Sequence, residues 1–86
     1  MFATLTREEN QTWYATELYN KLTNNVESFG DIPDERIIEL KSLITARTVS
    51  KHTLVTLVEL LFENNYAHAA KQVKYLLDNI KWSKKL

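Results

Sequence analysis

The sequence predicts an all-α protein, a compact four-helix bundle formed by a single domain over residues 1–86. The chain has one glycine and one proline, which is too few turn residues for a sheet protein of this length. Apolar residues recur at helical spacing in four separate stretches. The apolar content of 44% and the charged content of 26% are typical of a folded chain with a core.

The first helix is expected over about residues 7–24. Thr6 and Glu9 fit a capping box, in which the hydroxyl accepts a backbone N–H and the glutamate reaches back to the helix start. A loop is expected next, over 24–32, where Gly30 lies. One face of the helix is expected to be buried, with Trp13, Tyr14, Leu18, Tyr19 and Leu22.

The second helix is expected over about 33–46. Pro33 is tolerated in a first turn, and the acids Asp34 and Glu35 suit the positive end of a helix. The apolar residues of this helix are Ile37, Ile38, Leu40, Leu43 and Ile44.

The third helix is expected over about 51–63, capped by Ser50 or Thr48. It is apolar almost all round, so we expect it to be the central element. A buried strand over 53–62 is the alternative, but the chain offers no second strand of similar quality. The apolar residues are Leu54, Val55, Leu57, Val58, Leu60, Leu61 and Phe62.

The fourth helix is expected over about 66–81, after Asn64 and Asn65 supply a left-handed residue that ends the third helix. Ala69 and Ala70 are small and should let the two helices approach closely. The remaining core positions at helical spacing are Val73, Leu76, Leu77 and Ile80.

The net charge of zero is divided along the chain. Residues 1–40 carry eight acids against three bases, and residues 41–86 carry the reverse. Such a chain can attract its own halves, pair with a second copy or present a basic face to an acidic partner. The absence of cysteine fits a reducing, cytoplasmic location, and no stretch suits a secretion signal or a membrane span.

No pattern indicates an active site. His52 and His68 begin two antiparallel helices, so they should lie at opposite ends and share no metal ion. Ser50 lies two residues from His52, a spacing at which helical side chains do not meet. We therefore expect no enzyme, cofactor, metal site or small-molecule substrate. We interpret a cluster of four acids as favourable charge at the N-terminal end of a helix. These acids are Asp31, Asp34, Glu35 and Glu39.

Residues 47–58 resemble the turn and recognition helix of helix-turn-helix repressors. The matching residues are Val49, Ser50, Thr53 and Leu54. Thr48 departs from the glycine that is usual in that family, and Ile44 departs from its small residue. The resemblance implies a DNA-binding surface formed by Arg47, Lys51, His52 and Thr53.

A second resemblance covers about residues 50–77. It is to protein-binding helical hairpins of three kinds: the tetratricopeptide type, the lissencephaly-homology dimerisation motif and the helical tail of the COPII outer-coat subunit. The resemblance implies a hairpin that binds another protein or self-associates. It is carried by Leu57, Val58, Leu60, Glu63, Tyr66 and Ala69.

The aromatic residues exceed what a bundle this small can cover. Tryptophan and tyrosine are favoured at interfaces because they bury much area and keep a polar tip. We therefore expect a small adaptor or inhibitor, or a dimer, that docks a helical apolar and aromatic surface on a protein. A DNA-binding regulator using residues 47–58 is the alternative. The predicted partner-binding residues are Trp13, Tyr14, Phe29, Tyr75, Lys81, Trp82, Lys84 and Lys85.

Overall fold

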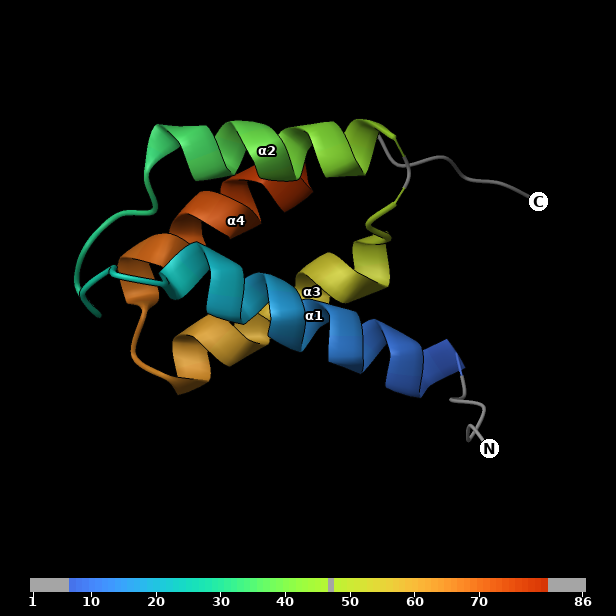
Figure 1. Ribbon diagram of the computed structural model, residues 1–86, viewed down its shortest axis with the longest axis horizontal. Helices are drawn as coiled ribbons and strands as arrows, with labels where there is room; N and C mark the ends of the chain where they lie inside the picture. Colours follow the sequence, from blue (N-terminus) through green and yellow to red (C-terminus); the bar gives the residue numbers. More distant parts are fainter. Residues whose placement is uncertain (1–6, 47, 81–86) are drawn as a thin grey trace.

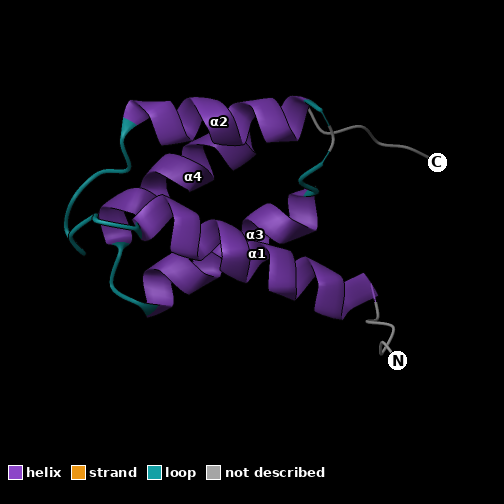
Figure 2. Cartoon of the chain, in the orientation of Figure 1, coloured by secondary structure: helices purple, strands orange, loops and turns teal. Residues whose placement is uncertain are grey.

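The computed structural model describes residues 7–46 and 48–80, and confirms the all-α four-helix fold (Figure 1). Each helix boundary lies within two residues of its prediction, and the described residues contain no strand (Figure 2). None of the described helices is long and apolar enough to cross a bilayer. The helices are α1 (Arg7–Thr23), α2 (Asp34–Thr45), α3 (Lys51–Glu63) and α4 (Ala67–Asn79).

Helix α3 is the central element, as predicted. It contacts both α1 and α4, and α1 crosses over it in Figure 1. Leu54, Leu57 and Leu61 are completely buried, and they recur at the three- and four-residue spacing of one helical face. Val55 and Phe62 remain exposed on the other side of the helix.

The ends of α3 are fixed by local hydrogen bonds. The Ser50 hydroxyl caps the helix by accepting the backbone N–H of Thr53 at 3.1 Å. At the other end Asn65 adopts a left-handed conformation with a φ of 68°, and the N–H of Tyr66 donates to the carbonyl of Leu61 at 2.8 Å. The chain therefore reverses tightly into α4.

Helix α4 packs against α3 and buries small residues in the core. Ala69 and Ala70 are both completely buried, as is Val73 one turn later. A side chain of one carbon lets the two helix backbones approach closely. Both alanines lie in the core, where the sequence placed them.

Helix α2 is attached mainly by its first turns. The Arg36 guanidinium donates to the backbone carbonyls of Leu22 and Asn24, and the ammonium of Lys21 lies 3.8 Å from the carboxylate of Glu39. Further along, Leu40 and Ile44 are buried in the core.

The loop before α2 is fastened to α4 by a side chain. The backbone N–H of Ile32 donates to Oε1 of Gln72 at 2.6 Å, and Nε2 of Gln72 donates back to the Ile32 carbonyl at 3.2 Å. Ile32 is almost completely buried, so both backbone groups need protein partners. Gln72 supplies both.

The prediction that Trp13 belongs to the buried face of α1 is wrong. Its side chain is 58% exposed, while Leu18 and Leu22 are buried and Tyr14 and Tyr19 are half-buried. At 3.6 residues per turn, a separation of nine residues places Trp13 on the opposite side of α1 from Leu22. The predicted capping residue Thr6 lies outside the described residues.

Candidate functional site

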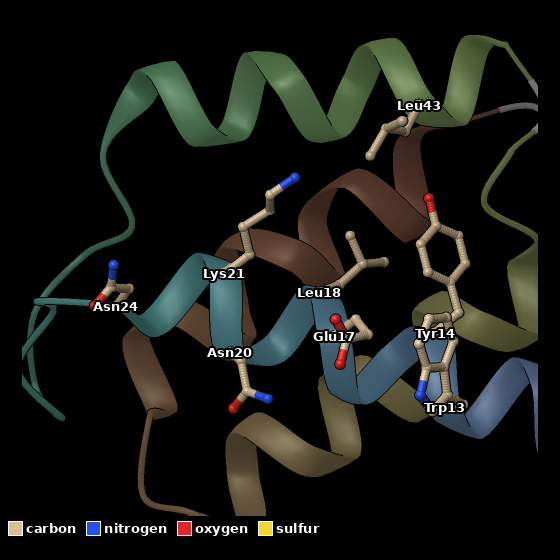
Figure 3. Close-up of a pocket in the computed structure, with 8 residues that line it drawn as sticks. All are labelled: Trp13, Tyr14, Glu17, Leu18, Asn20, Lys21, Asn24 and Leu43. Carbon is tan, nitrogen blue, oxygen red and sulfur yellow. The ribbon is translucent and has the colours of Figure 1, made fainter.

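An open hollow of about 650 Å³ lies between α1 and α2 (Figure 3). We call it the α1–α2 groove. Tyr14 and Leu18 project from α1 towards α2, and Leu43 projects back from α2 (Figure 3). The lining residues are Trp13, Tyr14, Glu17, Leu18, Asn20, Lys21, Asn24 and Leu43.

Helical spacing explains how α1 forms this groove. Tyr14 and Leu18 are four residues apart and share one face, which is the floor of the groove. Trp13, Glu17 and Lys21 follow the same four-residue spacing on the adjacent face and form the rim. The floor is thus apolar, while the rim carries an exposed indole and two charges.

The two ends of the groove differ. At one end the ammonium of Lys21 is paired with the carboxylate of Glu39, so a polar contact joins the helices there. At the other end, where Trp13, Tyr14 and Leu43 lie, no ion pair among the described residues joins α1 to α2. Glu17, on the rim between these ends, has no ion-pair partner in the described part of the chain. In Figure 1, α1 slopes away from α2 towards this aromatic end, so we call it the open end.

A second hollow, of about 450 Å³, lies between α2 and α4. Charged residues of both signs form much of its lining, and Tyr75 on its border is 67% exposed. Its lining therefore holds more charged residues than that of the α1–α2 groove. It is lined by Asp31, Asp34, Ile37, Lys41, His68, Lys71, Gln72, Tyr75 and Leu76.

The predicted partner-binding residues do not form one patch. Trp13 and Tyr14 meet in the α1–α2 groove, and Tyr75 borders the second hollow. Phe29 is 73% exposed in the loop between α1 and α2 and lines neither. Trp82 lies outside the described residues, as do three lysines, Lys81, Lys84 and Lys85.

Leu18 and Leu43 were expected only as core residues, and their part in the groove was not foreseen. Leu18 is buried on α1, and Leu43 is half-buried on α2 at the edge of the groove. Their apolar character was visible in the sequence. The spacing of apolar residues along each helix could not show that α1 and α2 are separated at this point.

The residues predicted to face DNA are only partly exposed. Lys51 and His52 are exposed in the first turn of α3, and Arg47 lies outside the described residues. Thr53 is instead 98% buried, and its hydroxyl lies 3.0 Å from that of Ser50 at the helix cap. A recognition helix needs a free face along its length. Helix α3 has an exposed face, but beyond Lys51 and His52 that face carries apolar and acidic residues, namely Val55, Glu59, Phe62 and Glu63.

Tyr66 links the α3–α4 turn to α1. Its ring and that of Tyr19 meet edge to face, with centroids 5.9 Å apart and planes at 82°. Burial raises the pKa of Tyr19 above its ordinary value, and the neighbouring Tyr66 hydroxyl raises it further. The pair is a packing contact on the side of α1 away from α2.

Among the side chains that the structure describes, no group of three or more histidine, cysteine, aspartate or glutamate residues is placed to hold a metal ion. No protein-family model, curated protein or solved structure matches this chain. The case for a function therefore depends on the chemistry of the surfaces described above.

Proposed function

We propose that this protein is a small, non-enzymatic interaction module that acts in the cytoplasm as an adaptor or an inhibitor. It works by docking the α1–α2 groove onto a partner protein or onto a second copy of itself. One observation carries the proposal: an open apolar groove with an exposed tryptophan at its mouth. Trp13 is 58% exposed there beside Tyr14 and Leu43.

The chemistry of the groove suits a protein partner. Binding energy at interfaces concentrates in a few tryptophan, tyrosine and arginine residues that fill or border pockets. Here Trp13 and Tyr14 border a hollow of about 650 Å³, which accommodates a large apolar side chain from a partner. The apolar floor supplies contact area, and the charged rim supplies orientation.

The experiment is affinity capture with the full chain from a lysate of its source cell. Trp13→Ala removes the indole at the groove, and Ile38→Ala is the matched control, because Ile38 is 62% exposed on α2 and does not line the groove. We expect a protein that wild type and Ile38→Ala retain equally. Retention should fall about tenfold or more with Trp13→Ala, as for an interface hot spot.

Sedimentation equilibrium on the same three proteins tests the self-association arm. A dimer formed through the groove is present in wild type and Ile38→Ala and is lost in Trp13→Ala. The proposal fails if all three are monomers and no captured protein distinguishes Trp13→Ala from the control. Far-UV circular dichroism checks that each variant retains its helix content.

A further inference from the structure

Part of the α1–α2 groove combines two aromatic rings with a carboxylate. Trp13, Tyr14 and Glu17 all line the groove, and all three project from α1 (Figure 3). Glu17 lies four residues after Trp13 and three after Tyr14, which are the two spacings at which side chains on a helix surface are neighbours. A chemical group that enters the groove here therefore meets the rings and the carboxylate together.

The Glu17 carboxylate has no ion-pair partner among the described residues. Lys21 follows it one turn later on α1, but the ammonium of Lys21 lies 3.8 Å from the carboxylate of Glu39 on α2. Arg36, in the first turn of α2, donates to two backbone carbonyls. Glu17 is thus open to a cation that a partner brings into the groove.

The elements that form the groove carry an excess of negative charge. Residues 7–45, which span α1, the following loop and α2, include eight acids and four bases. One of these bases, Lys41, lines the second hollow, between α2 and α4. A negatively charged surface attracts basic partners and repels acidic ones, most strongly at low salt. The charge of this region therefore favours a basic partner segment.

Aromatic rings and a carboxylate in one place match the guanidinium group of arginine. The planar guanidinium stacks on a tryptophan or tyrosine ring while its N–H groups donate to a carboxylate. Leu18 and Leu43 line the groove beside these groups and complement an apolar side chain. The volume of about 650 Å³ is sufficient for two side chains of this size.

We propose that the α1–α2 groove binds a segment of another protein that carries an arginine close to an apolar residue. The guanidinium stacks on Trp13 and Tyr14 and donates to Glu17, and the apolar side chain covers Leu18 and Leu43. This inference rests on the proposed function and names the chemistry of the partner.

The test is a titration of the isotopically labelled full chain with short peptides, followed by the indole N–H signal of Trp13, which the spectrum of Trp13→Phe identifies. The probe is acetyl-leucyl-glycyl-arginine amide, because residues two positions apart in an extended segment point to the same side. One comparison peptide has citrulline in place of arginine, with a similar shape and no charge. The other has glycine in place of leucine and keeps the charge.

We expect the probe to bind with a Kd below about 10 mM. Each comparison peptide should bind about five- to tenfold more weakly, one for want of the cation and the other for want of the apolar contact. Raising the salt concentration should weaken binding of the probe and leave binding of the citrulline peptide unchanged.

Two charge variants show whether Glu17 is the carboxylate that binds the guanidinium. Glu17→Gln keeps the length of the side chain and should lower the affinity for the probe to that for the citrulline peptide. Glu59→Gln is the matched control and should leave the affinity unchanged. Glu59 is likewise exposed, unpaired among the described residues and inside a helix, but it lies on α3 and does not line the groove.

Several results would overturn the proposal. They are a Trp13 signal that does not respond to the probe, equal affinities for the arginine and citrulline peptides, and equal responses of the two glutamine variants. Equal affinities for the leucine and glycine peptides would also overturn it, because any small guanidinium compound would then suffice. A groove-dependent dimer in the sedimentation experiment would do the same, because a second copy would then occupy the groove.

The peptide titration and the capture experiment can fail separately. If the peptides do not differ but a captured protein is lost with Trp13→Ala, the groove binds its partner without an arginine and the proposed function stands. If the peptides bind as expected but no protein is captured and no dimer forms, the proposed function alone falls. If both proposals hold, Glu17→Gln reduces capture of the partner and Glu59→Gln does not.

Discussion

Helices α2 and α3 are nearly equal in length, with 12 and 13 residues, yet they occupy very different environments. Helix α3 contacts both α1 and α4 and buries five residues on one face. Helix α2 buries Leu40 and Ile44, packs Ile37 and Leu43 partly against the core, and makes polar contacts near its start. The most apolar helix takes the position in contact with two others, and α2, with fewer buried residues, covers the core incompletely and leaves the groove beside it.

The largest expected effect on the free energy of unfolding concerns the buried face of α3. Leu57→Ala removes a completely buried side chain and should lower the free energy of unfolding by about 2–5 kcal/mol. Val55→Ala is the control on the same helix, and it should cost well under half as much because Val55 is 36% exposed. Urea denaturation measures both. Equal losses would contradict the central placement of α3.

The second prediction concerns the attachment of α2. Gln72→Ala removes both hydrogen bonds to Ile32 and leaves its buried N–H unsatisfied, which should cost about 1–3 kcal/mol. Amide hydrogen exchange should accelerate in α2 more than in α3, because the change loosens the loop that leads into α2. Lys71→Ala, at the exposed neighbouring position, is the control. Uniform acceleration in both helices would contradict a local attachment.

Much of the α3–α4 region could be predicted from sequence because its determinants are local. Ser50 caps the helix that directly follows it, and Asn65 turns the chain at the residue where the left-handed conformation is needed. Ala69 and Ala70 indicate a close helix approach by their size alone. Apolar spacing and these signals together located all four helices.

The candidate site could not be predicted in the same way, because it depends on how separate helices are placed. The groove needs a gap between α1 and the residue Leu43, and no spacing within either helix encodes that gap. Gln72 and Ile32 are 40 positions apart, and a glutamine in a helix gives no sign of such a partner. Trp13 was assigned to the core because it is apolar, although its position on the helix wheel faces away from Leu22.

A smaller effect is expected at the start of α3. Ser50→Ala removes the side-chain acceptor for the Thr53 N–H and should cost about 1 kcal/mol. Ser50→Asp should restore most of this loss, since aspartate is an equally good cap. Ser42→Ala, at an exposed position in the last turn of α2, should cost nothing because alanine is the better helix former there. Thermal or urea unfolding distinguishes the three, and a loss in Ser42→Ala equal to that in Ser50→Ala would contradict a specific cap.

The smallest expected effect lies on the well-packed side of the molecule, where Tyr19 meets Tyr66. The folded state raises the pKa of Tyr19 above its ordinary value of 10.0, first through burial and then through the neighbouring Tyr66 hydroxyl. The folded protein therefore retains the Tyr19 proton at a pH where the unfolded chain has begun to lose it. The associated stability is fully present below pH 10.0 and is lost as the pH rises towards the folded-state pKa. Urea denaturation across this range should show a decline that Tyr19→Phe reduces and Tyr75→Phe, at an exposed tyrosine, leaves in place. If Tyr19→Phe leaves the decline in the free energy of unfolding unchanged, the contact between Tyr19 and Tyr66 does not disfavour the Tyr19 phenolate.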